Sequence, residues 1–567
     1  MTCDEKIRSN DFYDVIVSTE SFDRIVEPPD CVQPIDDTYS VFYYDRDRVA
    51  PLSIENYTYS AIPKCLGLLD TTALEVSGIL QLQTQPALSL KGQGVLVGFV
   101  DTGIAYENAC FRRGDGSTRI RAIWDQTAEA QSEAELPEGF SYGREYTMET
   151  IDRALQSGNP HEIVPQTDED GHGTVLASIA CGSEDLSANF TGAAPLSDIL
   201  VVKLKPAKQY LREFFFIPET AQVYQENDVM AGVAYLEKKA QEYGQPLVIC
   251  IGLGMNNGSH SGAGVLSEYL NSIGGRWRRC VVIASGNEAN ARHHFTERES
   301  PGKNGGGTLV EINVEQDIPG FYLELWARAP ELFAVSIRAP GGALLPAAAS
   351  RNIAHQAFTF TFENTRVEID YRTAGRTRGD QLVFVRFERA VRGIWTLNVY
   401  PDTTITAESF HVWLPMSGML HKDVYFLKPD PDTTLTVPSA ANIPITVGGY
   451  RMSDNSIYLN SGRGYTAASA VKPDFTAPAV GVQGVGRREN YLTADGTSVA
   501  AAITAGACAQ ILEWGAVRRR DLSLNSVEIG NILIRGCDRD SGRSYPNTSW
   551  GYGRLDVAGA LETLTGS

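Results

Sequence analysis

The chain has 567 residues, of which 43% are hydrophobic and 21% charged, a composition typical of a globular protein with a sizeable core and more than one domain. Its formal net charge of −20 disfavours a nucleic-acid partner, because an acidic surface repels phosphate backbones. We also expect no membrane partner and no classical signal peptide. No apolar run reaches the roughly 18–20 residues of a membrane span, and no apolar signal core follows Met1.

The first 70 residues are irregular apart from strand-like stretches at 14–18 and 39–44, and they are expected to form a small accessory unit. From residue 71, continuous apolar runs alternate with helix-like stretches. This pattern predicts an α/β fold, with a largely parallel sheet covered by helices. The runs are 94–100, 199–204, 246–251 and 281–284, and the helix-like stretches between them include 174–181 and 227–243.

Residues 300–434 change to a period of two, with turn clusters between short alternating stretches. This pattern predicts an antiparallel β-sandwich. The α/β pattern returns at 445–449 and closes with a small-residue helix at 497–512. We therefore predict four segments: an N-terminal segment (1–70), the first part of an α/β domain (71–299), an inserted β-sandwich (300–434) and the second part of the α/β domain (435–567).

The nine cysteines include no C-x-x-C pair. Four of them lie in small or apolar stretches and are predicted to be reduced core residues: Cys181, Cys250, Cys280 and Cys508. An odd number of thiols without a redox or metal spacing is typical of a protein that stays inside a cell. The expected location is therefore cytoplasmic.

Three separate segments carry side chains suited to nucleophilic catalysis. Asp101 ends an apolar strand, at the edge where open α/β sheets place their sites, although it also fits a plain turn. His172 lies between two glycines directly before a small-residue helix, where close approach is easy. Ser498 lies at the start of an apolar helix, whose N-terminus favours negative charge, although a capping serine is the alternative.

Together the three segments are more specific than each one alone. A histidine can take the proton of a serine near neutral pH, and a carboxylate holds the imidazole in the useful tautomer. Asn287 follows the apolar run 281–284, and its amide can donate to a developing oxyanion beside the backbone N–H of Ser498. A plain Gly-Asn turn is the alternative for that position.

At these segments the chain resembles the subtilisin-like serine peptidases, or subtilases. The matching motifs, in the family's order, are Asp101-Thr102-Gly103, His172-Gly173-Thr174, Gly286-Asn287 and Gly496-Thr497-Ser498. The resemblance implies a three-layer α/β/α fold. It makes Ser498 the nucleophile, His172 the general base and acid, Asp101 the orienting carboxylate and Asn287 the oxyanion donor. It also makes Gly252, Leu253 and Gly254 the strand with which an extended protein or peptide substrate pairs.

The inserted sandwich makes the chain similar to the subtilases of spore-forming anaerobes that act in spore germination. Those proteins carry a jelly-roll domain at this place and an N-terminal propeptide. The resemblance implies a serine endopeptidase made as a precursor, cytoplasmic or spore-associated, whose own N-terminal segment lies in the substrate cleft. Self-cleavage is expected near Asp70-Thr71, after a last propeptide strand within 57–69.

Two other functions are open from the sequence. One is a catalytically silent subtilase-like scaffold that acts as a sensor or regulatory binding protein. The other is a carbohydrate-binding sandwich built on aromatics such as Trp326 and Trp395, which fit core positions better. No cofactor and no metal are expected. Calcium sites occur in the family, but the acidic run 168–170 fits a solvated turn, and a metal at His172 lacks a second His or Cys at ligand spacing.

Overall fold

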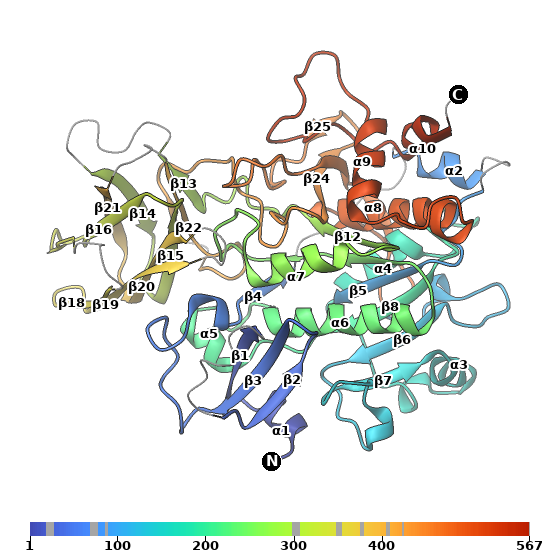
Figure 1. Ribbon diagram of the computed structural model, residues 1–567, viewed down its shortest axis with the longest axis horizontal. Coiled ribbons are helices and arrows are strands. Elements are labelled where there is room, and N and C mark those ends of the chain that lie inside the picture. The colour runs from blue at the N-terminus through green and yellow to red at the C-terminus, as the bar shows by residue number, and fades with distance from the viewer. Residues whose placement is uncertain are drawn as a thin grey trace.

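The computed structural model describes residues 1–18, 28–68, 77–84, 89–297, 307–347, 354–374, 379–403, 409–421 and 424–565. The chain forms an α/β unit, a unit of two antiparallel sheets and a small N-terminal unit. Figure 1 shows the two antiparallel sheets at one end of the long axis and the central sheet of the α/β unit toward the other.

A nine-stranded, mostly parallel sheet forms the centre of the α/β unit. Its strand order is β25-β24-β12-β10-β5-β8-β6-β7, and β26 also pairs with β24. Strands β7 and β25 pair antiparallel with their neighbours, while the other pairs are parallel. The strands are β5 (Leu96–Asp101), β6 (Ile120–Asp125), β7 (Arg144–Thr147), β8 (Asp198–Lys203), β10 (Leu247–Ile251), β12 (Arg279–Ala284), β24 (Ile445–Arg451), β25 (Ser456–Ile457) and β26 (Phe475–Val480).

Alternate residues of β5 enter two different cores, which explains its continuous apolar sequence. Val97 and Phe99 pack in a core shared with α4 (His172–Cys181), α8 (Thr497–Leu512), α9 (Ser526–Gly536) and α10 (Val557–Thr565). Leu96 and Val100 pack in a core shared with α6 (Glu226–Glu242) and α7 (Val265–Gly274). The predicted α/β/α layers are therefore confirmed. The other helices are α2 (Ile79–Thr84), α3 (Met148–Gln156) and α5 (Gln209–Phe214).

Helix α8 crosses the middle of the α/β unit. Together with the helical turn Glu513–Val517 that follows it, α8 forms the helix Thr497–Val517. Within the described ranges, this is the one helix with the length and apolar composition of a membrane span, and 94% of its most apolar window is buried inside the protein. Its small residues allow close packing, since Ala193 leaves no room for a side chain at Gly506. This burial is that of a core helix.

Two antiparallel sheets share a third core around residues 308–426. One has the order β13-β22-β15-β20-β19-β18 and the other β17-β16-β21-β14-β23. Trp326 and Trp395 are both buried, so neither offers an exposed sugar platform, while the jelly-roll connectivity stays a prediction. The strands are β13 (His294–Thr296), β14 (Thr308–Val314), β15 (Ile318–Ala327), β16 (Leu332–Arg338), β17 (Leu344–Leu345), β18 (Ala354–Phe360), β19 (Thr365–Ala374), β20 (Asp380–Ala390), β21 (Gly393–Thr403), β22 (Phe410–Trp413) and β23 (Val424–Phe426).

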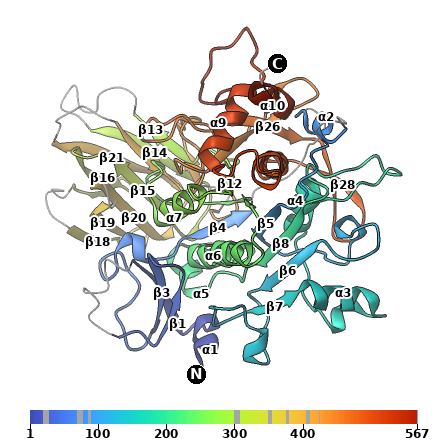
Figure 2. The same cartoon turned by 45° about the vertical axis from the view of Figure 1, so that its right-hand side comes forward.

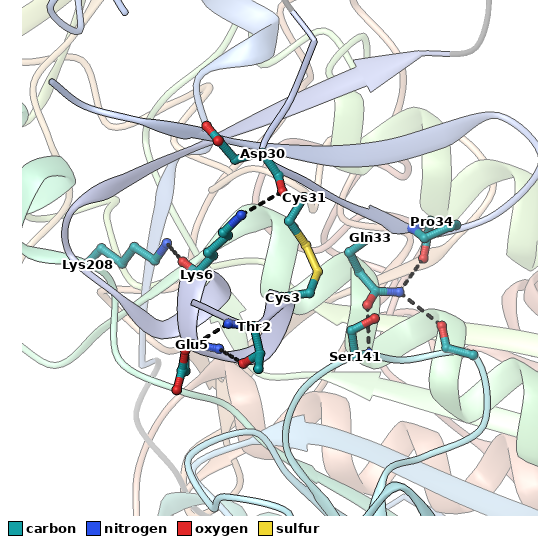
Figure 3. Close-up of a disulfide and its surroundings, with 11 residues drawn as sticks. Thr2, Cys3, Glu5, Lys6, Asp30, Cys31, Gln33, Pro34, Ser141 and Lys208 are labelled. Atoms are coloured by element: carbon teal, nitrogen blue, oxygen red, sulfur yellow. Dashed lines mark hydrogen bonds between the residues drawn. A yellow bond between two sulfur atoms is a disulfide. The ribbon is translucent and has the colours of Figure 1, made fainter. Parts of the chain in front are cut away.

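The N-terminal unit packs α1 (Cys3–Arg8) on a three-stranded antiparallel sheet of β1 (Phe12–Ser18), β3 (Tyr39–Asp45) and β2 (Cys31–Pro34). Cys3 of α1 forms a disulfide with Cys31 of β2, and Lys6 Nζ donates to the Asp30 carbonyl at 2.9 Å beside it (Figure 3). The other seven cysteines are buried thiols. The disulfide is a feature that the expectation of an intracellular, reduced protein did not include.

Candidate active site

Asp101, His172 and Ser498 meet at the carboxyl edge of the central sheet. Asp101 is the last residue of β5, His172 the first of α4 and Ser498 the second of α8. His172 Nδ1 lies 2.7 Å from Asp101 Oδ1, and His172 Nε2 lies 3.4 Å from Ser498 Oγ. All three side chains are buried. The imidazole is therefore between the carboxylate and the hydroxyl, within reach of a proton on either side.

Two glycines allow α4 to begin at this edge. Gly171 precedes the helix with φ of 97°, a left-handed conformation that glycine adopts without steric cost. A side chain at Gly173 would collide with the backbone of Gly103, just after Asp101. Glycine at both positions therefore lets His172 approach the end of β5 closely enough to reach Asp101.

Asp168 joins the segments of Asp101 and His172, and its position corrects the expectation of a solvated turn. Its side chain is buried and accepts four hydrogen bonds. Oδ1 accepts from Thr102 Oγ1 at 2.7 Å and from Gly171 N at 2.9 Å, while Oδ2 accepts from Thr174 N and Oγ1 at 2.8 and 2.6 Å. The sequence does place Asp168 four residues before His172, just ahead of the predicted helix that His172 begins. That position could have indicated that Asp168 accepts from the first backbone N–H groups of the helix.

The Asn287 amide has a defined orientation beside Ser498. Its Oδ1 accepts from Thr497 N at 3.3 Å and from Thr497 Oγ1 at 3.2 Å. Thr497 Oγ1 in turn accepts from Gly286 N at 3.1 Å. Since Thr497 occupies the carbonyl end of the amide, the NH₂ end is the one left to donate to a ligand. Thr497 is a contributor to the site that motif reading did not single out.

Gly252 separates β10 from β11 (Leu253–Gly254) and lies against two of the site residues. A Cβ at Gly252 would lie 3.1 Å from His172 Cε1 and 3.2 Å from Ser498 Cβ. A larger residue at this position would crowd the His172 ring, so glycine keeps the space beside the ring open. The predicted strand Gly252-Leu253-Gly254 thus begins directly beside Ser498 and His172.

Strand β11 pairs antiparallel with β4 (Cys65–Leu68), with Leu253 opposite Leu68 and Gly254 opposite Gly67. On its other side β4 pairs antiparallel with β9 (Val223–Gln225). The chain direction of β4 leads toward Gly252 and hence toward Ser498. The expected cleavage point at 70–71 follows β4 but lies outside the described residues.

Metal-ligating side chains and a buried thiol near the site are the remaining candidates for other chemistry. In the part of the chain that the structure describes, no group of three or more His, Cys, Asp or Glu side chains is arranged to hold a metal ion. Burial raises the pKa of the Cys250 thiol, on the strand before Gly252. Cys250 is therefore a protonated core residue.

These features define an α/β protein with a serine, a histidine and an aspartate at one sheet edge. The subtilase family model matches residues 92–311 and 427–553, more than half of the chain. The structure of the Clostridium perfringens CspB protease has a TM-score of 0.76 and 27% identity, and the match covers 87% of this chain and 98% of that one. The chain therefore belongs to the subtilase family, the subtilisin-like serine peptidases.

A curated plant relative matches a short part of the chain. The subtilisin-like protease SBT2.2 of Arabidopsis thaliana is 32% identical over 126 residues, which are 20% of this chain and 15% of that protein. The chain thus matches about a seventh of the length of this relative.

Proposed function

We propose that this chain is a serine endopeptidase that hydrolyses peptide bonds of protein substrates through an acyl-enzyme. The observation that carries the proposal is the pair of contacts made by His172, 2.7 Å to Asp101 and 3.4 Å to Ser498. A serine hydroxyl becomes an effective nucleophile when a positioned base removes its proton. Family membership and the likeness to a protease structure support the same class of reaction.

In the acylation step, the Ser498 Oγ–H proton moves to His172 Nε2 while Oγ forms a bond to the substrate carbonyl carbon. The carbonyl oxygen becomes an oxyanion, which accepts hydrogen bonds from Asn287 Nδ2 and the backbone N–H of Ser498. Asp101 holds the Nδ1–H and stabilises the imidazolium. The C–N bond then breaks, and His172 gives its proton to the leaving amine.

Deacylation repeats these steps with water. His172 takes a proton from the water, whose oxygen attacks the ester carbon, and the proton returns to Ser498 Oγ when the acid product leaves. Side chains and water complete both halves of the reaction, so we propose that the reaction needs no cofactor.

The substrate would bind as an extended strand along β11, and the N-terminal segment would occupy this place in a precursor. The support is the antiparallel pairing of Gly67 and Leu68 with β11. Main-chain pairing of this kind gives affinity without reading side chains. A cut near residue 70 would then release the cleft for other substrates.

A silent scaffold is the second candidate, because β4 fills the strand position that a substrate needs. In that case the N-terminal segment stays in place permanently. The two candidates differ in whether Ser498 ever reacts.

The deciding experiment compares wild type with Ser498→Ala by intact-mass analysis and fluorophosphonate labelling. We expect wild type to lose a segment that ends near residue 70 and to carry one label at Ser498, and Ser498→Ala to show neither change. Ser187→Ala removes a surface hydroxyl outside the site and serves as the matched control. An uncut wild type that stays unlabelled after an added protease has removed its N-terminal segment would contradict the peptidase and favour the scaffold.

A further inference from the structure

A hairpin directly before Ser498 carries two adjacent arginines beside the catalytic histidine. The hairpin consists of β27 (Val482–Val485) and β28 (Tyr491–Ala494). It lies beside α4 (Figure 2), and Val485 N donates to Ser178 Oγ of that helix at 2.9 Å. Arg487 and Arg488 lie in its exposed turn. A cavity of about 460 Å³ is lined by both arginines together with Asp170, His172 and an apolar wall from α4 and β28.

This cavity lies on the leaving-group side of the scissile bond. A peptide in the register of β4 runs along β11 toward Gly252, so its acyl part lies between β11 and β9. The residues after the scissile bond must continue beyond Ser498. The cavity is formed by the start of α4 and by the hairpin that leads into Ser498, so it is open to those residues.

The charges around the cavity favour an anion. Arg487 donates to the Glu169 carbonyl, which fixes one guanidinium at the rim. The Arg488 guanidinium has no hydrogen-bond or ion-pair partner within the described ranges. Asp170 is the one carboxylate among the residues that line the cavity, and it accepts from His172 N at 3.2 Å, while Glu489 accepts from Ala109 N. The lining thus contains two guanidiniums and one carboxylate. The carboxylates of Asp101 and Asp168 are not among the lining residues, and they already accept from His172 and from four other donors.

We propose that this cavity is a specificity subsite for a carboxylate, taking an Asp or Glu side chain from the first two residues after the scissile bond. Arg488 would pair with the carboxylate, because a guanidinium offers a fork of donors that matches two carboxylate oxygens. Val175, Leu492 and Ala494 supply an apolar wall for the aliphatic part of the side chain. The inference rests on the proposed peptidase function and specifies its substrate class.

The chain's own sequence fits this preference. After β4 it continues Leu69-Asp70-Thr71, outside the described residues. Leu68 lies opposite Leu253, so in this register the scissile bond would be the one between Leu69 and Asp70, one bond before the Asp70-Thr71 bond named above. A cut there would make Asp70 the first residue of the leaving part and offer an acid where the subsite would take one.

The test uses fluorogenic peptides that share an acyl part copied from residues 62–69 and differ at the next position: Asp, Asn or Lys. For wild type we expect kcat/KM to be roughly 3–10-fold higher for Asp than for Asn, and lowest for Lys. The Asp-to-Asn ratio should shrink in high salt, because screening weakens a partly exposed ion pair. A second set moves the varied residue one position further along.

Arg488→Gln should bring the Asp-to-Asn ratio close to one, and Arg488→Lys should keep part of it. Arg535→Gln removes an exposed arginine on α9 and should keep the wild-type ratio. Equal rates on Asp and Asn peptides at both positions, or a ratio that persists in Arg488→Gln, overturn the subsite and leave the peptidase function standing. Failure to cleave any peptide, together with an unlabelled Ser498, overturns both.

Discussion

Two buried polar networks of the molecule are assembled differently. One is the proposed catalytic edge, where Asp101, His172 and Ser498 meet, and the other is the docking face of the N-terminal unit, where Asp14 contacts Lys208. At the catalytic edge, Asp101, His172 and Ser498 each belong to a short motif whose neighbours hold it in place, as Thr497 holds Asn287. At the docking face, Asp14 is fully buried and pairs with Lys208 Nζ at 2.5 Å. The difference teaches that the first network follows from local sequence, whereas the second depends on which distant residues the fold brings together.

The docking face extends to the antiparallel sheets through one carboxylate. Glu324 of β15 is buried and accepts from Tyr59 OH at 2.8 Å and from Asn257 Nδ2 at 2.7 Å. Tyr59 precedes β4, and Asn257 follows β11, the strand with which β4 pairs. The Glu324 side chain thus bridges the N-terminal segment, the loop after β11 and the antiparallel sheets.

The largest expected effect is at the docking face, where Lys208→Met would leave the Asp14 carboxylate buried without its cation. Removing one partner of a buried ion pair costs about 3–5 kcal/mol. We expect a loss of this size in the free energy of unfolding, measured in urea, with earlier proteolysis of residues 1–68. Arg48→Met removes an exposed partner of Asp30 and should cost at most about 1 kcal/mol. Equal effects of the two substitutions would show that the docking face contributes no more than a surface pair.

At the catalytic edge, Asn287→Ala should lower kcat by about 10²–10³-fold, or about 2.7–4 kcal/mol, with little change in KM. The reason is that its NH₂ group would contact the oxyanion, which forms after substrate binding. Thr497→Val keeps the amide but removes the hydroxyl that orients it, so the loss in kcat should be smaller. Peptide hydrolysis rates give both values. A loss that appears in KM rather than kcat would contradict the oxyanion role.

Asp168→Asn tests how strongly the positions of Asp101 and His172 depend on a buried residue that holds their two segments together. The amide NH₂ cannot accept, so two of the four donors facing residue 168 would lose their partner. The expected cost is about 1–3 kcal/mol per unpaired group. We expect kcat to fall by about 10–100-fold, and Asp168→Glu to recover little because the longer side chain misplaces both oxygens. Glu169→Gln, an exposed neighbour, should change the rate by less than about 2-fold.

The difference between a network built from local motifs and one built from distant segments also explains which features the sequence could predict. The α/β pattern follows from local periodicity, and the candidate residues Asp101, His172 and Ser498 follow from their motifs and chain order. The strand at Gly252 follows from the family resemblance that these motifs carry. The four hydrogen bonds of Asp168 were not predicted, because a run of three acidic residues is typical of a solvated turn and local sequence does not show which of the three is buried. The pairing of Asp14 with Lys208 and the disulfide between Cys3 and Cys31 depend on how separate segments dock, and no local pattern records that.

The smallest expected effect is a pH dependence of the unfolding free energy that arises from Glu288. This residue connects the loop of Asn287 with a distant segment of the chain. Glu288 follows Asn287, accepts from His293 Nδ1 at 2.7 Å and accepts from Ser417 N at 2.9 Å in the inserted unit. Burial alone would raise the pKa of Glu288, but His293 and these hydrogen bonds outweigh it and hold the pKa below its usual 4.5. A carboxyl with a lowered native pKa contributes stability that is present above 4.5 and lost as the pH falls through the native value.

Wild type should therefore lose unfolding free energy more steeply than Glu288→Gln as the pH falls below 4.5. Urea unfolding at a series of pH values between neutral and acid gives the slope of unfolding free energy against pH for wild type and for the variant. Glu288→Gln should be less stable than wild type at pH 7, because the charged form that His293 favours is gone.

Labelling of Ser498 in the same samples separates the two networks. If the labelling rate of Glu288→Gln falls together with its stability, the inserted unit braces the oxyanion loop. If the rate holds while stability falls, the catalytic edge is maintained by its own local motifs.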